Sequence, residues 1–399
     1  MNLSILKNKT SEEIGKHLDI KDRVTLLERL STLGLPSKKN EAYRYFDVEK
    51  LLEKEYKILD NLPMSPKPSN KIEIKDGIVV AAPQGMRVYS EHCDKIDMDH
   101  FDPLYYLGHL LSPQTIKIEL DGDVEVEIEH TFTQSDTLIH YRIVLYNQAN
   151  RHATVYENFV HETIENTLVL YGYDMHIAQD STLRVVKMQS MQHSGYSMIA
   201  SHTINVAQNA NALLKTFDIG SDQALQLFKI TLDTHAHVDA GHLLYLNANA
   251  KRGTVSQIVH TGEYASSTQE AKNILDAQSR GIFDALIKVE NTAKYTKAAQ
   301  NSQAILLHDG AYMIAKPQLE IYIDELEASH GATIGQLDKQ QLFYLESRGI
   351  SHVEAKKILV IAFANTLIEQ VKDSRQQERI KIAFEKAFYA GYSENSSLS

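Results

Sequence analysis

The stretches IAQDSTLRV (177–185), VAQNANALLKT (206–216) and HVDAGHLLYL (237–246) resemble one another. They start at residues 177, 206 and 237, so they recur about every 30 residues. Each combines a short strand-like run with polar or small corner residues, and no helix pattern separates them. Near-periodic strands of this kind are typical of a β-solenoid, in which each coil covers its neighbour and aliphatic side chains stack inside. The repeat therefore predicts a solenoid core.

Strand-like alternation extends beyond these repeats toward the N-terminus. In TIKIELDGDVEVEIEH (115–130), apolar and polar residues alternate, a turn follows at 121–123, and the alternation then resumes. An up-and-down barrel or a sandwich gives a similar pattern, but those folds favour tight glycine-containing hairpins, which are sparse after residue 130. We therefore predict a mainly β chain whose core is a β-solenoid.

Helical patterns flank the predicted core. Residues 10–34 have helical spacing of apolar residues, and the proline-containing stretch NLPMSPKPSNK (61–71) indicates a boundary. Asp338 and Gln341 have the spacing of a capping box at the start of a helix. We predict three parts, which are an N-terminal helical region with its linker (1–71), the β core (72–336) and a C-terminal helical domain (337–399).

The composition argues against several partners. The net charge is −11 and basic residues are dispersed, so neither nucleic acid nor an anionic membrane is expected to bind. There is no apolar run of about 18 residues and no secretory signal, which predicts a cytoplasmic location. The single cysteine, Cys93, excludes an internal disulfide framework and any cluster site built from this chain's thiolates alone.

The sequence lacks the common catalytic motifs. No GxGxxG, GxxxxGK[ST], GxSxG or CxxC occurs, and the acidic residues are dispersed rather than paired as a solenoid glycosidase would need. We predict that the chain is not an enzyme, and a β-helix carbohydrate-active enzyme is the alternative. Eight central histidines without metal-ligand spacing are expected to be exposed strand residues. They are His161, His176, His193, His202, His235, His237, His242 and His260.

One further histidine, His330, lies in ASHGATIG (328–335), between a predicted strand and a capped helix. Its small neighbours are expected to form a sharp turn and to leave the imidazole uncrowded. Two interpretations stay open from the residues alone. The histidine is either a turn residue satisfied by local contacts, or a metal ligand whose co-ligands come from another chain.

Three stretches resemble the SufB/SufD family of iron–sulfur cluster assembly scaffolds. They are KPQLEIYIDELEASHGATIGQLDKQQLFYLESRGIS (316–351), RGIFDALIKVENTAKYTKAAQNSQAILL (280–307) and GLPSKKNEAYRYFD (34–47). The chain resembles the SufD type, because SufB chains typically read HEAT where this one reads HGAT from His330, and carry a cysteine near Gln303. It departs from some SufD sequences at Ala328, where they have cysteine, and from the common N-terminal pattern at Tyr43, where tryptophan is usual.

The resemblance implies a right-handed parallel β-helix with helical regions at both ends. It also implies a scaffold subunit that pairs with a SufB-like paralogue, or with itself when alone, and that binds SufC, an ABC-type ATPase, through its C-terminal helices. By position, His330 would be a ligand of a nascent iron–sulfur cluster shared with the SufB-like chain, and the isolated chain would hold no cofactor.

The C-terminal helices contain the residues expected to contact the ATPase. They are Leu342, Phe343, Tyr344 and Arg348. Packing of this segment on the solenoid is the alternative for these residues. For the whole chain, a structural homodimer without metal chemistry stays open as well.

Overall fold

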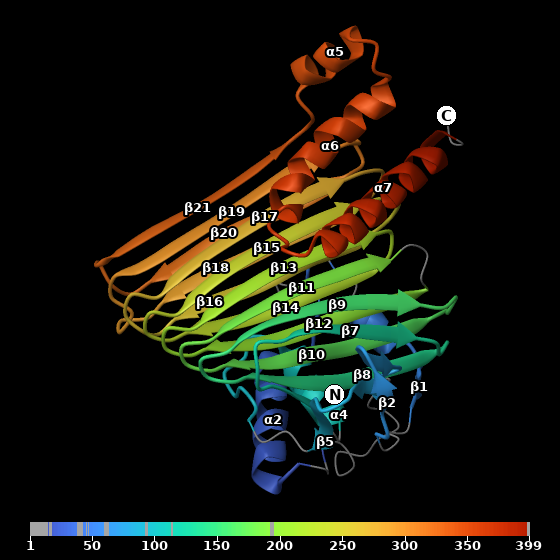
Figure 1. Ribbon diagram of the computed structural model, residues 1–399. Coiled ribbons are helices and arrows are strands. Elements are labelled where there is room, and N and C mark those ends of the chain that lie inside the picture. The colour runs from blue at the N-terminus through green and yellow to red at the C-terminus, as the bar shows by residue number, and fades with distance from the viewer. Residues whose placement is uncertain are drawn as a thin grey trace.

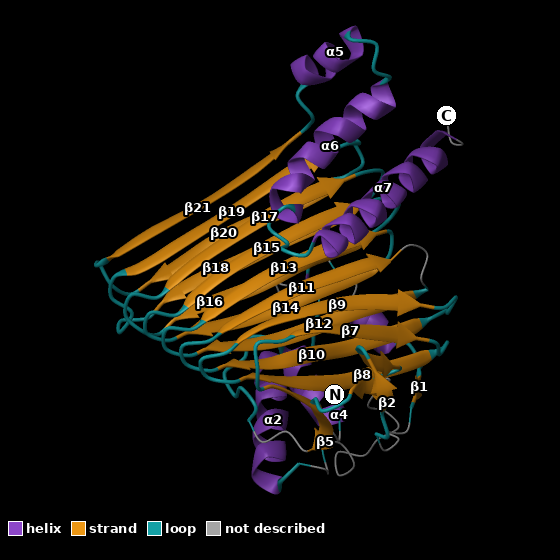
Figure 2. Ribbon diagram, in the orientation of Figure 1, coloured by secondary structure: helices purple, strands orange, loops and turns teal. Residues whose placement is uncertain are grey.

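A computed structural model of the chain describes residues 15, 18–37, 43–44, 46, 48–59, 64–91, 95–112, 115–191 and 195–396. Strands are the most common regular element among these residues, and helices lie at both ends (Figure 1, Figure 2). Consecutive long strands lie in different sheets, and strands two positions apart pair in parallel. The chain therefore winds in coils, each of which gives one strand to each of two sheets.

Among the described residues, the two sheets have ten and eleven strands. The ten-stranded sheet contains β1 (Lys57–Ile58), β5 (Arg87–Glu91), β6 (Thr115–Leu120), β8 (Thr137–Asn147), β10 (Thr167–Ile177), β12 (Tyr196–Val206), β14 (Gln223–Leu232), β16 (Lys251–His260), β18 (Arg280–Val289) and β20 (Tyr312–Ile321). The eleven-stranded sheet contains β2 (Lys67–Ser69), β3 (Ile72–Lys75), β4 (Ile78–Pro83), β7 (Glu125–Phe132), β9 (His152–His161), β11 (Thr182–Met191), β13 (Asn211–Gly220), β15 (His237–Leu246), β17 (Ser266–Leu275), β19 (Thr296–Leu306) and β21 (Leu326–Gly335).

The lumen between the sheets is filled by side chains that stack from coil to coil. Val185 on β11 is in register with Val155 on β9 and with Leu214 on β13, and all three belong to the hydrophobic core. Side chains alternate between the two faces of a strand, so residues in register form columns that point either inward or outward. We call a set of lumen-facing residues in register an inward column. Burial of each aliphatic side chain contributes about 1.5–3 kcal/mol, which makes these columns the main source of stability.

The corners between strands account for the polar residues that separate the repeats. Asn150, Asp180 and Asn209 have positive φ angles, a conformation that Asn and Asp adopt more readily than other residues with a side chain. Asn209 Nδ2 also donates a hydrogen bond to Asp180 Oδ1, one coil earlier, at 2.8 Å. The corners predicted from the repeats are confirmed, and they tie each coil to the next.

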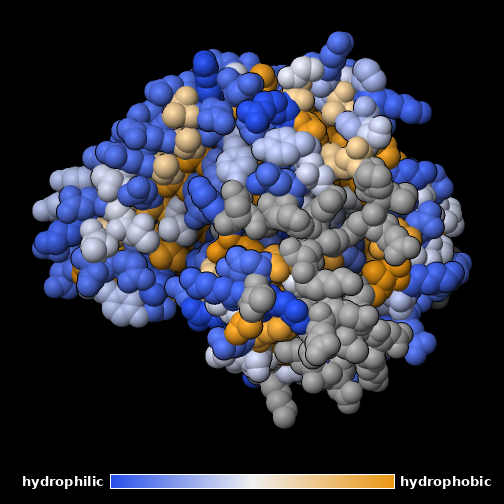
Figure 3. Space-filling view, turned by 90° about the horizontal axis from the view of Figure 1, so that it is seen from below, coloured by the Kyte–Doolittle hydropathy of each residue, from blue (hydrophilic) through white to orange (hydrophobic). Residues whose placement is uncertain are grey.

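The N-terminal end of the solenoid is covered. β5 pairs antiparallel with β6, and the antiparallel pair β3 and β4 continues the other sheet beyond β7. The helices at this end are α2 (Ile20–Leu33), α3 (Val48–Glu53) and α4 (Pro103–Leu111). Leu30 of α2 and Leu107 of α4 pack with Leu138 and Leu168 of the ten-stranded sheet. From this end, hydrophobic residues lie among hydrophilic ones on the surface (Figure 3).

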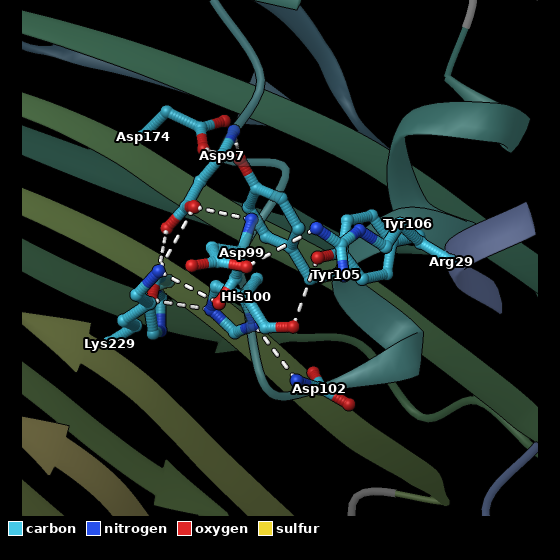
Figure 4. Close-up of polar contacts among 10 residues, drawn as sticks. Arg29, Asp97, Asp99, His100, Asp102, Tyr105, Tyr106, Asp174 and Lys229 are labelled. Atoms are coloured by element: carbon cyan, nitrogen blue, oxygen red, sulfur yellow. Dashed lines mark hydrogen bonds and ion pairs between the residues drawn. The ribbon is translucent and has the colours of Figure 1, made fainter. Parts of the chain in front are cut away.

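Buried polar contacts hold the segment around α4 on the ten-stranded sheet (Figure 4). Tyr105 donates to Asp174 Oδ1 at 2.8 Å, and Lys229 forms an ion pair of 2.8 Å with Asp97. His100 lies between them, and burial lowers its pKa from 6.5 to about 3, so the ring is neutral at physiological pH. These contacts join the helix to several coils at once.

The C-terminal helices are α5 (Lys339–Ser347), α6 (His352–Ile368) and α7 (Ser374–Ser396). α6 and α7 pack on the outer face of the eleven-stranded sheet, where Leu367 and Phe384 join a cluster with Phe217 and Tyr245. α5 differs from them, because none of its residues is buried. It projects beyond the last strands of the solenoid (Figure 1).

The predicted fold class is confirmed, because the chain is mainly β, has a parallel solenoid core and has helices at both ends. A barrel or sandwich built from hairpins does not fit, since β6 and β7 lie in different sheets and the turn at 121–123 is a solenoid corner. The three-part division stays a prediction. β1 and β2 already pair with the sheets before residue 72.

Two local predictions need correction. ASHGATIG forms most of β21 rather than a turn, because pairing with β19 holds these small residues extended. The helix predicted over 10–34 is α2, which begins at Ile20 after the N-cap Asp19. Residues 10–14 of the predicted helix lie outside the described residues.

Candidate functional site

The C-terminal end of the solenoid is open. β20 and β21 are the last strands of their sheets, and no strand among the described residues pairs with their outer edges. No residue of β21 is buried. Tyr312, Tyr322 and Ile334 are each 45–56% exposed, which is high for large apolar side chains. Such an edge offers unpaired backbone donors and acceptors to another chain. We call this end of β20 and β21 the open end.

His330 lies on β21 in an inward column. It is in register with Gln300 on β19, which is in register with Gln269 on β17 and then with Ala240 on β15. Ala240 belongs to the hydrophobic core of the lumen. The imidazole therefore points along the face that a next coil would cover, and it is exposed because no further coil follows β21 among the described residues.

One hydrogen bond selects the tautomer of the neutral ring. His330 Nδ1 lies 3.1 Å from the backbone oxygen of Pro317 on β20, across the lumen. A carbonyl oxygen only accepts, so the neutral ring carries its proton on Nδ1 and keeps its lone pair on Nε2. A histidine that binds metal commonly donates its other N–H to a carbonyl or carboxylate in this way.

The other inward side chains of the last coil are small or apolar. Ala328 and Ala332 flank His330 two residues away on β21, and Pro317 and Leu319 face it from β20. The imidazole is thus uncrowded, as the small neighbours predicted, although they form a strand. An imidazole on an otherwise apolar surface needs a polar partner or a metal when that surface is covered.

The residues predicted to contact the ATPase lie on or next to α5, which follows β21. Phe343 is 70% and Tyr344 58% exposed, and the Arg348 guanidinium lies 5.3 Å from the centre of the Tyr344 ring. Leu342 is partly buried. The alternative, in which this segment packs on the solenoid, does not hold for Phe343 and Tyr344. Their contact with a partner stays a prediction.

The eight central histidines do not behave as one group. His202, His242 and His260 are buried, so the expectation of exposed strand positions is wrong for them. At these positions the side chains point into the packed interior. The lack of metal-ligand spacing in the sequence gives no information about which side chains are buried. His235 is exposed, His176 and His237 are partly buried, and His193 lies outside the described residues.

A second polar group lies inside the lumen, nearer the covered end. His130 Nε2 and Glu157 Oε1 are 2.9 Å apart, and Lys187 Nζ donates to Tyr171 at 2.5 Å and to Gln226 at 2.6 Å. Burial lowers the pKa of Lys187 while Glu157 opposes that effect. Sequence reasoning missed this group. Its members are paired with one another, which favours a structural role in the lumen.

No set of three or more histidine, cysteine, aspartate or glutamate residues able to hold a metal ion occurs in the described part of the chain. Cys93 lies outside that part. None of the described helices is both long and apolar enough to cross a membrane. His330 is therefore an isolated donor whose chemistry depends on what covers the open end.

These features define a solenoid protein with one covered end and one open end that presents a single inward imidazole. A family model described as SUF system FeS cluster assembly, SufBD core domain, matches residues 130–363, and the chain belongs to this family. The resemblance seen in the sequence is thereby confirmed.

Similar proteins carry names that belong to the same family. The iron-sulfur cluster assembly protein SufD of Escherichia coli (strain K12) is 28% identical over 242 residues, which are 60% of this chain and 57% of the relative. An iron-sulfur cluster assembly SufBD family protein of Mycobacterium tuberculosis is 27% identical over 281 residues, which are 70% of this chain and 63% of the relative. SufD of Bacillus subtilis is 30% identical over 116 residues, covering 29% and 26%. The chain spans less than two thirds of each relative's length.

Proposed function

We propose that this chain is a SufD-like scaffold subunit of an iron–sulfur cluster assembly complex. In this proposal its open end pairs with a SufB-like paralogue, its C-terminal helices bind the ATPase SufC, and His330 is a ligand of the nascent cluster at the interface. The chain acts in the cytoplasm without catalysing a reaction itself, and it holds no cofactor when isolated. The SufD names of its relatives support this assignment over the SufB type.

The observation that carries the proposal is the position of His330. It is an inward-facing imidazole on the last strand of a solenoid, at an edge with no described partner strand. A second solenoid placed end to end would satisfy the backbone groups of β21 and would bury His330 in the same step. Pairing and ligand delivery would then occur together.

The chemistry of the donor supports iron as its target. Imidazole replaces thiolate on iron in Rieske-type clusters, so a chain with one cysteine still has a suitable ligand. The hydrogen bond from Nδ1 to Pro317 leaves Nε2 for the metal. The remaining ligands would come from the SufB-like chain, since Ala328 removes a nearby thiol found in some relatives.

Exposure of α5 supports docking of the ATPase at the C-terminal helices. The helix buries none of its residues against the solenoid, and Phe343 and Tyr344 present two aromatic rings to solvent. Exposed aromatic residues with an adjacent arginine are the residue types that dominate the energy of protein interfaces. The family assignment favours this reading over a carbohydrate-active solenoid enzyme.

The test is a His330→Ala variant in a complex co-expressed with SufB-like and SufC partners. We expect the complex to form and its iron and sulfide content to fall at least several-fold, because a ligand is lost and the fold is not. His308→Ala is the matched control, since His308 is also exposed and lies in the connection between β19 and β20. Wild-type cluster content in His330→Ala would contradict the ligand assignment.

A homodimer without metal chemistry is the competing outcome. It predicts that the chain, co-expressed with both partners, elutes as a dimer of itself and retains neither of them. Recovery of a complex that contains the SufB-like chain, in the His308→Ala control as well as in the wild type, would support the scaffold function. Failure to recover either partner would remove its main support.

A further inference from the structure

The inward column that ends at His330 changes its chemistry toward the open end. Through the middle coils it is aliphatic, with Val155, Val185 and Leu214 in the hydrophobic core. Its last members before His330 are two glutamines, Gln269 on β17 and Gln300 on β19, which are 1% and 2% exposed. Aliphatic residues would pack there equally well, so the amides need an explanation of their own.

The two glutamines belong to a buried chain of hydrogen bonds. Gln300 Nε2 donates to Gln269 Oε1 at 3.1 Å, and Gln269 Nε2 donates to Ser256 Oγ at 2.8 Å. Gln269 Nε2 also lies 3.2 Å from His242 Nε2, and His242 Nδ1 lies 2.8 Å from Thr216 Oγ1. We call these five residues the amide row.

The amide row has a direction. Burial lowers the pKa of His242 from 6.5 to about 3, so its ring is neutral and Nε2 accepts from Gln269 while Nδ1 donates to Thr216. Each amide of the row therefore turns its N–H group toward the interior of the solenoid. The carbonyl oxygen of Gln300 is left at the end of the row.

That oxygen is buried and has no hydrogen-bond partner among the described residues. Buried acceptors are rarely left unpaired in native proteins, and reversing the Gln300 amide alone would place its carbonyl oxygen about 3.1 Å from that of Gln269. The next residue of the column is His330, whose Cα pairs with that of Gln300 across strands spaced about 4.8 Å apart. An imidazole N–H is thus the nearest donor type in register.

We infer that Gln300 is a positioning residue for His330, and that its amide oxygen accepts the imidazole N–H when a second chain covers the open end. This inference rests on the proposed function. In the uncovered chain the His330 N–H donates a hydrogen bond to the backbone oxygen of Pro317. Two acceptors of the same chain, Pro317 at the lumen wall and Gln300 beneath, then limit the orientations of the ring, which coordinates iron through its other nitrogen.

The test compares substitutions of two buried glutamines in the complex with SufB-like and SufC partners. Gln300→Met keeps the side-chain volume and removes the acceptor. Gln189→Met is the matched control, because Gln189 is equally buried and is hydrogen-bonded to Gln226, but is not in register with His330. We expect Gln300→Met to speed cluster loss about tenfold or more, as is usual when a partner of a metal-binding histidine is removed, and Gln189→Met to leave it unchanged.

A second readout separates positioning from general loss of packing. With histidine of this chain labelled with ¹⁵N, pulsed electron paramagnetic resonance of the reduced cluster detects the non-coordinating ring nitrogen, whose coupling depends on its hydrogen bond. Gln300→Met should change this coupling and Gln189→Met should not. Gln300→Leu replaces the methionine variant if that variant does not fold.

The outcomes distinguish this inference from the function on which it rests. If His330→Ala lowers cluster content while Gln300→Met behaves like Gln189→Met in both readouts, Gln300 has no positioning role and the proposed function stands. If His330→Ala itself retains wild-type cluster content, the ligand assignment in the proposed function fails. Loss of the cluster in both His330→Ala and Gln300→Met, with Gln189→Met unaffected, supports the inference.

Discussion

The two ends of the solenoid differ in whether further strands and helices protect the terminal coil. At the N-terminal end, antiparallel strands continue both sheets and α2 and α4 cover the ten-stranded wall. At the C-terminal end, β20 and β21 stop without a covering element among the described residues, and α5 turns away from the solenoid. One chain thus contains both a covered end and an open end.

This difference supports the proposal that the open end is an interface. Unprotected edge strands invite unwanted pairing, and proteins usually cover, shorten or charge them. At the N-terminal end, antiparallel strands extend both sheets and helices pack on the outer face of the ten-stranded sheet, so the fold has a means of protecting its edges. The open end instead presents exposed apolar residues such as Ile334 and a single inward imidazole. The comparison predicts that substitutions at the covered end change stability, whereas those at the open end change assembly.

The largest effect is expected for the buried ion pair near the covered end. Arg142 Nη2 lies 2.9 Å from Asp174 Oδ2, and both side chains are about 1% exposed. Burial alone would raise the pKa of Asp174, but Arg142 and His109 hold it well below its usual range. Arg142→Met leaves that carboxylate without its main partner, so we expect the free energy of unfolding to fall by about 3–5 kcal/mol in urea titrations.

The matched control for this ion pair lies at the open end. Lys297 and Glu327 form an ion pair of 3.3 Å between side chains that are 68% and 75% exposed. Lys297→Met should leave the urea midpoint nearly unchanged, because solvent screens such pairs. Equal destabilisation by Arg142→Met and Lys297→Met would contradict the contrast between the ends.

The next effect concerns assembly. Ile334 lies on β21 and is 45% exposed, so Ile334→Lys should not alter the stability of the isolated chain. Burial of the new ammonium group in an interface is expected to weaken pairing with the SufB-like chain by about 3 kcal/mol, which is more than 100-fold. Light scattering and co-purification measure this. Val80→Lys on β4, 37% exposed at the other end, is the control, and equal loss of pairing there would contradict an interface at β21.

The buried histidine His100 should make the free energy of unfolding depend on pH in the acid range. Burial lowers the pKa of His100 from 6.5 to about 3, so between these values the unfolded chain binds a proton that the folded chain does not. The free energy of unfolding therefore decreases as the pH falls through this window, by about 1.4 kcal/mol per pH unit for each such histidine. In His100→Gln the measured slope should be smaller by that amount. An unchanged slope would show that His100 does not remain neutral in the fold.

The smallest change in stability is expected on α5. Phe343→Ala removes a side chain that is 70% exposed, so the free energy of unfolding should change by less than about 0.5 kcal/mol. Binding of the SufC ATPase should nevertheless weaken at least about tenfold, as for other aromatic residues at the centre of an interface. Calorimetry with purified ATPase measures this, with Val24→Ala on α2 as the control. Unchanged affinity in Phe343→Ala would place the docking surface elsewhere.

The sequence was sufficient to predict the solenoid because its repeat is local and regular. Corner residues such as Asp180 and Asn209 mark each coil, and their positive φ angles follow from ordinary turn chemistry. The segment around His330 was harder to predict. Ala328, Ser329 and Gly331 have weak strand propensity, and only their pairing with β19 makes them a strand.

The surroundings of His330 were not predicted because they depend on register. Gln269, Gln300 and His330 are separated in sequence by 31 and 30 residues, and they become neighbours only when the coils are aligned. Their spacing of about 30 residues matches the repeat length, but the corners differ in length from coil to coil, so the alignment of these residues is hidden in the sequence. The prediction that His202 and His242 are exposed was wrong for the same reason, because the alignment of the coils sets which face of a strand points inward.

The most direct test of a shared cluster at the open end is to detect the nitrogen donor on the iron. Only this chain is labelled with ¹⁵N-histidine, the complex is assembled with unlabelled SufB-like and SufC partners, and the reduced cluster is examined by pulsed electron paramagnetic resonance. We predict a ¹⁵N coupling from a directly bound nitrogen in the wild-type chain and in His308→Ala, and its absence in His330→Ala. A cluster without this coupling in the wild type, or one that keeps it in His330→Ala, would contradict the account.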